Sequence, residues 1–329
     1  MLLYGCKHGK DALPAGVLHL LRGTAIAAVG FPFIRPARQI RLRQRWSAQL
    51  LKILGIRLEK DEPFVAPGSL LVANHVSWLD IFVINAAYPA AFISKAEVRE
   101  WPLIGWLAAK NETVFLRRGS RGHARIVNAE IASLLGRGRQ VALFPEGTTT
   151  DGSLVHPFHA ALLQPAIEAG APIQPLALCY RLPDGRFTRA PAYDGDVSLL
   201  DCLKAIVAER EIVARIHVAP ALSTTEQPDR KQLSQRARDT IVAALDAGGQ
   251  GRGADAVDPG DGSRRADDVD VGHLAEPDRL RVQLLGGLRV VGKRLLIGAA
   301  AALGFMAHAA GKEVQDVVSG GIGLAFIAF

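Results

Sequence analysis

Cysteine is scarce in this sequence: its 329 residues include three, Cys6, Cys179 and Cys202. They are far apart and odd in number, so they form neither a disulfide framework nor the paired spacing of a zinc site. Aromatic residues are also few, at 6%, and no recognised nucleic-acid-binding module is present. These shortages argue against a disulfide-rich secreted protein and against a nucleic-acid partner, and they favour a reducing cytosol.

The sequence also lacks a convincing secretory signal and a clean transmembrane run. Residues 13–34 are apolar but include His19, Arg22 and Pro32, and a charge near the middle of a membrane span is costly. A helix lying in the membrane interface is more economical, with the following arginines facing anionic headgroups. These arginines are Arg35, Arg38, Arg41, Arg43 and Arg45. The alternative is a core helix followed by a solvated basic helix.

Apolar residues and positive charge are plentiful. Hydrophobic residues make up 49% of the chain, and its formal net charge is +7. A basic, fairly apolar chain suits an anionic membrane surface or an anionic substrate.

Short apolar segments alternate with segments of helical period. We expect strands at residues 69–73, 91–94, 113–116, 140–144, 173–180 and 213–218, and the start of another at 56–58. We expect helices at residues 39–54, 78–88, 119–136, 199–209 and 230–245. This alternation predicts an α/β fold with a mixed, largely parallel sheet flanked by helices. Sites in such sheets lie beyond the carboxyl ends of strands.

Composition divides the chain into four segments. Residues 1–54 are predicted to be helical and membrane-associated, and residues 55–247 form the α/β domain. Residues 248–281 are rich in Gly, Asp and Arg, and they have too few large apolar residues to offset the entropy of ordering, which predicts a disordered linker. Residues 282–329 are an atypical apolar extension. It is either a membrane-associated hairpin or the product of translation in another frame of a GC-rich gene.

A histidine and an aspartate follow the first of the strands at 69–73. Residues 74–80 read NHVSWLD. If the chain folds back, Asp80 can fix the tautomer of His75, and His75 can take a proton from a substrate hydroxyl. The alternative is structural, because Ser77 and Asp80 also have the spacing of a helix capping box.

A second polar segment, FPEGTTTDG at residues 144–152, follows the strand at 140–144. Gly147 allows a sharp turn, and the amides and hydroxyls after it, including Thr148, can form an anion nest. Glu146 would repel a phosphate, so we expect it to orient an arginine or to bind a hydroxyl. Arg117 and Arg118 stand at another strand end, where guanidinium groups suit phosphate oxygens, although exposed basic pairs are common. Lys95 precedes the pair of tryptophans at 101 and 106, which form either an apolar wall or core packing.

Four segments in this order, NHVSWLD, VFLRRG, FPEGTTTDG and APIQPLA, resemble the glycerolipid acyltransferase family, typified by bacterial 1-acyl-glycerol-3-phosphate acyltransferases. The resemblance covers residues 46–219. It implies an enzyme at the cytoplasmic face of the inner membrane, peripheral or anchored by its N-terminal segment. The reaction implied is fatty acyl transfer from acyl-CoA or acyl carrier protein to a lysolipid hydroxyl. The thioester is already activated, so we expect no metal and no other cofactor.

The resemblance also assigns roles by position. His75 is the implied general base and Asp80 the carboxylate that orients it. Arg117, Glu146 and Gly147 are implied to belong to the acceptor site. To these we add three candidate substrate-binding residues, Lys95, Arg118 and Thr148.

The sequence departs from the family pattern at two points. Thr149 stands where the family commonly has arginine, and PFHA at residues 157–160 replaces a segment of the form basic-x-Gly. We expect 1-acyl-sn-glycerol-3-phosphate as acceptor, giving phosphatidic acid, but these changes keep another lysolipid open, such as a lyso-ornithine lipid. A non-catalytic peripheral protein that binds anionic lipid is the remaining alternative.

Overall fold

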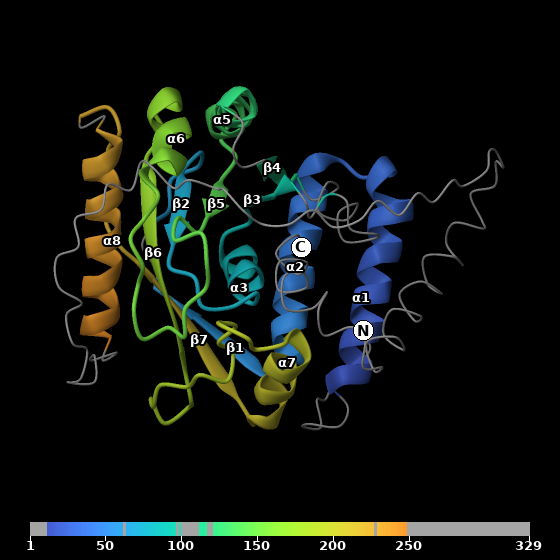
Figure 1. Cartoon of the computed structure of the whole chain (residues 1–329). Coiled ribbons are helices and arrows are strands. Elements are labelled where there is room, and N and C mark those ends of the chain that lie inside the picture. Colours follow the sequence, from blue (N-terminus) through green and yellow to red (C-terminus); the bar gives the residue numbers. More distant parts are fainter. Residues whose placement is uncertain are drawn as a thin grey trace, which may run out of the picture. The chain divides into compact units, whose positions relative to one another are not determined.

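The computed structural model describes residues 12–61, 64–96, 99, 112–116, 121–226 and 229–248, which all fall in one compact unit. The helices are α1 (Ala12–Ala25), α2 (Pro36–Ile53), α3 (Asp80–Ala87), α5 (Arg121–Gly136), α6 (Gln164–Ala169), α7 (Leu199–Ala208) and α8 (Arg230–Ala247) (Figure 1). The strands are β1 (Ile56–Lys60), β2 (Leu70–Ala73), β3 (Ala91–Lys95), β4 (Val114–Leu116), β5 (Val141–Leu143), β6 (Ile173–Arg181) and β7 (Ile212–Val218).

The seven strands form one sheet in the order β1-β7-β6-β2-β5-β3-β4. Strand β2 lies parallel to both neighbours, with Leu70 opposite Val141 of β5 and Ile173 of β6. Among the described strands only the pair β6 and β7 is antiparallel. The predicted mixed, largely parallel sheet is therefore confirmed. Because β2, β3, β4, β5 and β6 run the same way, their carboxyl ends share one edge, called here the carboxyl edge.

The sheet is covered by helices on both faces, and β2 shows why. Its side chains alternate, so Leu71 and Ala73 belong to one buried cluster while Leu70 and Val72 belong to another. The first cluster packs against α2, α3 and α7, and the second against α5, α6 and α8. Figure 1 shows α8 on one side of the sheet and α2 with α3 on the other. A strand buried on both faces is continuously apolar, as β2 is.

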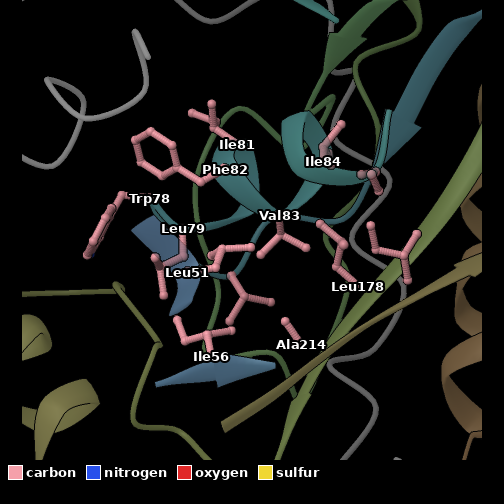
Figure 2. Close-up of a cluster of buried hydrophobic side chains, with 14 of the residues drawn as sticks. Leu51, Ile56, Trp78, Leu79, Ile81, Phe82, Val83, Ile84, Leu178 and Ala214 are labelled. Carbon is pink, nitrogen blue, oxygen red and sulfur yellow. The ribbon is translucent and has the colours of Figure 1, made fainter. Parts of the chain in front are cut away.

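Helix α3 lies at the centre of the first cluster. Its sequence DIFVINAA is apolar nearly all round, and seven of its residues are buried. Figure 2 shows Phe82 and Val83 among side chains from other elements, including Leu51, Leu178 and Ala214. Each large side chain buried in this way contributes about 1.5–3 kcal/mol. This packing holds the first turn of α3, and with it Asp80, firmly against the sheet.

The N-terminal segment folds as two helices joined by a short irregular turn. After α1, a π-helical turn at Ile26–Gly30 and a 3-10 turn at Phe31–Phe33 lead into α2. The ring of His19 stacks on Trp46 at a centroid distance of 4.7 Å, so α1 packs against α2. Burial lowers the pKa of His19. None of the described helices is long and apolar enough to cross a membrane.

One residue of the predicted headgroup-facing arginine cluster is placed differently. Arg43 is buried, and its Nη2 lies 2.7 Å from Glu112 Oε2. The prediction that Arg43 faces headgroups is therefore wrong, because α2 turns this residue towards the interior. The other four arginines of the cluster are exposed.

Most predicted elements match the structure within a few residues. Helix α2 ends before Gly55, whose φ of 72° suits a glycine that terminates a helix. The short helix α6 was not predicted. The described chain ends at Gly248, one residue after α8. The predicted linker and C-terminal extension therefore lie, from residue 249 onwards, outside the described residues.

Candidate active site

Asn74 sets where the chain leaves the sheet. Its Nδ2 donates to the carbonyl of Leu178 at 3.0 Å, and its Oδ1 accepts from the Leu178 amide at 2.8 Å. The side chain thus replaces one backbone pairing between β2 and β6, just beyond the last residue of β2. Because the backbone of this segment is no longer paired with β6, it can turn at His75 and lead into α3 at the carboxyl edge.

Asp80 is fully buried, yet its carboxylate has four hydrogen-bond donors. Oδ2 accepts from His75 Nδ1 at 2.8 Å and from the amides of Val76 and Ser77 at 2.7 and 2.9 Å. Oδ1 accepts from the hydroxyl of Tyr180 at 2.6 Å. A buried carboxylate is costly unless it is hydrogen-bonded, and this set of partners meets that condition. The fold therefore holds a charge directly beside the imidazole of His75.

Tyr180 is a component of this site that the sequence analysis missed. It is fully buried near the carboxyl end of β6. Burial, reinforced by the charge of Asp80, raises its pKa well above the ordinary value, so the side chain stays a phenol and donates its proton. A tyrosine at the end of an apolar strand was the available signal, but only the pairing of β6 with β2 shows its partner.

The imidazole of His75 is held on two sides. Its ring stacks on Phe144 with a centroid distance of 4.0 Å and an interplanar angle of 9°. Its Nδ1 faces Asp80, so the proton lies on Nδ1 and the lone pair on Nε2. The side chain is 7% exposed. A neutral imidazole with a fixed tautomer and a partly accessible Nε2 can accept a proton from a hydroxyl placed beside it.

Ser77 has a smaller capping role than its spacing suggested. Asp80 reaches back to the Ser77 amide, as in a capping box, but the Ser77 hydroxyl accepts from Leu79 N at 3.2 Å. The reciprocal bond to the amide of Asp80 is replaced by a backbone bond from that amide to the Ser77 carbonyl at 3.1 Å. The structural and functional interpretations of this segment therefore hold together: Asp80 both secures the turn and contacts His75.

Glu146 joins the two polar segments, because β5 lies next to β2 at the carboxyl edge. Its Oε1 accepts from the backbone amide of His75 at 2.7 Å, and its Oε2 accepts from that of His156 at 2.7 Å. The side chain is buried, and burial raises its pKa to about 7. Its hydrogen-bond partners are thus backbone amides, whereas we expected an arginine or a hydroxyl.

The turn after Glu146 is compact and is tied to the His75 segment. Gly147 has a φ of 72°, which explains the glycine. Thr148 is exposed. Thr149 donates its hydroxyl to the carbonyl of Tyr193, and the amide of Thr150 donates to the carbonyl of His75 at 2.9 Å. Gly147 and Thr148 therefore lie beside the candidate centre, and their role in binding substrate stays a prediction.

The remaining predicted substrate-binding residues are only partly placed. The backbone of Lys95 ends β3 at the carboxyl edge, opposite Leu116 of β4, and its side chain is outside the description. Arg117 and Arg118 lie outside the described residues, directly after the last residue of β4. In the sheet, β4 is the third strand from β2, so the distance between these two strands is roughly 14 Å.

Cys202 lies near the site but is unsuited to act as a nucleophile. It is buried, and its Sγ donates to the carbonyl of Pro191 at 3.5 Å. Burial raises its pKa to about 11, so it stays protonated near neutral pH. Because the thiolate is the reactive form of cysteine, a Cys202 acyl intermediate is disfavoured.

Comparisons with known proteins agree with the geometry. A family model described as Acyltransferase matches residues 55–179. The lyso-ornithine lipid O-acyltransferase of Pseudomonas aeruginosa is 40% identical over 212 residues, which cover 64% of this chain and 81% of that protein. The 1-acyl-sn-glycerol-3-phosphate acyltransferase of Neisseria meningitidis is 38% identical over 192 residues, covering 58% of this chain and 75% of that protein.

One solved structure is a more distant match, the 1-acyl-sn-glycerophosphate acyltransferase of Thermotoga maritima. It is 20% identical with a TM-score of 0.49, covering 72% of this chain and 97% of that chain. A likeness at this level adds nothing to the assignment, which rests on the sequence relatives. Since those relatives match across most of their own length, this chain belongs to the glycerolipid acyltransferase family and is an O-acyltransferase.

Proposed function

We propose that this enzyme transfers a fatty acyl group from acyl-CoA or acyl carrier protein to the hydroxyl of a lysolipid, with His75 as the general base. The observation that carries the proposal is the buried contact between His75 Nδ1 and Asp80 Oδ2 at 2.8 Å. It fixes the neutral tautomer in which Nε2 can accept a proton.

The chemistry follows from this arrangement. The lysolipid hydroxyl attacks the thioester carbonyl carbon while its proton passes to Nε2 of His75. The new ester C–O bond forms, the C–S bond breaks, and the leaving thiolate takes the proton from His75. Asp80 stabilises the imidazolium that exists between these steps. A base of this kind typically contributes roughly 10²–10⁴-fold to the rate.

The donors to the tetrahedral oxyanion are not the amides nearest to His75. The amides of Val76 and Ser77 donate to Asp80, and that of Leu79 donates to the Ser77 hydroxyl. The amide of His75 itself donates to Glu146. These four amides hold the site in shape, so other groups must stabilise the oxyanion.

Two acceptors fit different observations. For 1-acyl-sn-glycerol-3-phosphate, the support is the Arg117–Arg118 pair in the sequence and the relative from Neisseria meningitidis, which is named for that substrate. For a lyso-ornithine lipid, the support is Thr149 in place of an arginine and the relative from Pseudomonas aeruginosa. The proposed acceptor class is therefore a lysolipid whose headgroup carries an anionic group, a phosphate or a carboxylate.

The N-terminal helices supply a surface that suits a membrane interface. Leu18, Val29 and Phe33 are 58%, 55% and 88% exposed. The exposed arginines Arg35, Arg38, Arg41 and Arg45 begin α2 close by in sequence. Apolar side chains beside cations favour the surface of an anionic bilayer. We place the enzyme at the cytoplasmic face of the cell membrane, where acyl-CoA and acyl carrier protein are available.

The test is an acylation assay with membranes from cells that overproduce the protein and from cells that lack it. A labelled acyl thioester is supplied with either 1-acyl-sn-glycerol-3-phosphate or a lyso-ornithine lipid. We expect protein-dependent formation of the diacyl product with at least one acceptor. Binding to anionic liposomes without turnover of either acceptor would contradict the proposal and favour a non-catalytic lipid-binding protein.

A further inference from the structure

The segment after β6 lies against the candidate active site. Residues 182–197, called here the strap, connect β6 to α7. The amide of Tyr193 donates to the carbonyl of Val76 at 3.0 Å, and its carbonyl accepts from the hydroxyl of Thr149. The strap is therefore bonded both to the segment that carries His75 and to the turn after Glu146. It forms one wall of the site rather than a separate surface loop.

The strap places one arginine at this wall. Arg189 Nη2 forms an ion pair with Asp151 Oδ2. The other carboxylate oxygen of Asp151 accepts from the amide and the hydroxyl of Ser153 at 2.8 and 2.6 Å. Asp151 is only 15% exposed, whereas Arg189 is 67% exposed. Both oxygens of the Asp151 carboxylate thus have partners, which fixes the carboxylate. It holds the guanidinium of Arg189 while that group stays exposed to solvent.

The arginine keeps most of its binding capacity. A guanidinium group has five N–H donors, and among the described residues Asp151 is the only partner of the Arg189 side chain. The free N–H groups can form a two-pronged contact with a phosphate or a carboxylate. Asp151 therefore fixes the position of the guanidinium and leaves its other N–H groups available to bind an anion.

The position of this arginine relative to His75 follows from the backbone bonds. The amide of Thr150 lies 2.9 Å from the carbonyl of His75, and Asp151 is the next residue, with adjacent Cα atoms about 3.8 Å apart. Asp151 and its arginine therefore stand at the rim of the site. The neighbouring Thr149 is uncharged, and its hydroxyl is occupied by Tyr193.

We infer that Arg189 binds the anionic group of the acceptor headgroup, a phosphate or a carboxylate, and that Asp151 positions it. The inference rests on the proposed lysolipid acyl transfer and names the residue that selects its substrate class. Arg189 supplies, from the strap, the cation that Thr149 does not provide. It binds substrate away from the reacting atoms, so it acts on acceptor affinity and leaves proton transfer at His75 unchanged.

The test compares Arg189→Gln with Arg186→Gln in the full-length enzyme in neutral-detergent micelles. Arg186 is on the same strap but pairs locally with Asp184. In Arg189→Gln we expect the KM for an anionic acceptor to rise about tenfold or more, the loss of a charge-assisted contact. The kcat and the KM for the acyl thioester should not change. Arg189→Lys should restore part of the affinity, and Asp151→Asn should raise the KM less than Arg189→Gln.

Three acceptors separate the sources of the anion. The assay uses 1-acyl-sn-glycerol-3-phosphate for the phosphate, a lyso-ornithine lipid for the carboxylate, and a monoacylglycerol for neither. The effect of Arg189→Gln should be confined to the anionic acceptor that the wild type uses. An equal rise in KM with the monoacylglycerol or in Arg186→Gln, or no rise at all, would overturn the inference while leaving the proposed acyl transfer intact.

Binding decides the inference independently of turnover. Tryptophan fluorescence is titrated with a soluble short-chain 1-acyl-sn-glycerol-3-phosphate and with a short-chain lyso-ornithine lipid, without thioester. At least one should bind about tenfold more weakly to Arg189→Gln than to the wild type. If the wild type acylates nothing but this difference is found, Arg189 is confirmed as a ligand of the lysolipid headgroup while the proposed reaction fails. Equal binding of both lipids would refute the role of Arg189.

Discussion

The hydroxyl of Tyr180 lies 2.6 Å from Oδ1 of Asp80, a residue 100 positions earlier in the chain. It approaches the carboxylate at the oxygen that His75 does not contact. Since β6 lies beside β2, the sheet itself brings this donor to the site. Tyr180 is therefore a third member of the site, and it lies outside the sequence segment that contains His75 and Asp80.

Tyr180→Phe removes this donor and leaves the ring. We expect unfolding free energy to fall by about 1–3 kcal/mol, because Asp80 keeps a buried charge with one partner fewer. The control is Tyr88→Phe, since the hydroxyl of Tyr88 is buried without a hydrogen-bond partner in the described structure. Urea denaturation of the two variants measures the difference. Equal losses would show that the Tyr180 contact contributes nothing specific.

Asp80→Asn keeps the size of the side chain but removes its charge and half of its acceptors. If the amide nitrogen takes the place of Oδ2, it faces N–H donors and His75 loses the partner that fixes its tautomer; in the other orientation the amide nitrogen faces the Tyr180 hydroxyl. In both orientations the charge beside His75 is lost. We expect kcat to fall by about 10²-fold or more, with little change in the KM for either substrate. Steady-state kinetics on folded protein measures this. A fall confined to KM would mean that Asp80 acts in binding.

Glu146 should make stability depend on pH. Burial raises its pKa from 4.5 to about 7, so between these values the folded state binds more protons than the unfolded state, and stability falls as pH rises. The wild-type unfolding free energy minus that of Glu146→Gln should decrease from pH 4.5 to 7, by on the order of 3 kcal/mol, and stay level above. Denaturation at a series of pH values measures it. A difference that is constant with pH would contradict the assigned environment.

Two glycines test the packing that positions β2. Gly68 and Gly138 have nearly equal φ values of 74° and 75°, so alanine costs each about 1–2 kcal/mol of conformational strain. A Cβ at Gly68 would also lie 2.7 Å from the carbonyl oxygen of Leu135, whereas one at Gly138 would meet nothing within 4 Å. Gly68→Ala should therefore lower the thermal midpoint more than Gly138→Ala. The opposite order would be inconsistent with the described approach of β2 to α5.

Local pattern predicted the elements and the core of the site, but not contacts between distant segments. The strand ends at His75 and Glu146 could be located from apolar runs and turn residues. The contact of Tyr180 with Asp80 could not be predicted, because local periodicity does not determine the order of the strands in the sheet. The contact of the strap with Thr149 could not be predicted for the same reason.

Arg43 shows a different cause of error. It lies four and seven residues before Ser47 and Leu50, on the buried stripe of α2, so helical period alone would have placed it inside. The cluster of arginines was instead interpreted by charge. Its burial is explained by Glu112, which is 69 residues away in the chain.

The central claim is that His75 accepts the proton of the lysolipid hydroxyl. The control for its removal is His217→Ala, because His217 also contacts a carboxylate, Asp61 at 3.2 Å, but lines a different pocket beside the end of α8. The decisive measurement is the rate of lysolipid acylation by His75→Ala and His217→Ala, at equal amounts of folded protein. We expect His75→Ala to lose activity by about 10²-fold or more and His217→Ala to keep it. Undiminished turnover in His75→Ala would contradict the account.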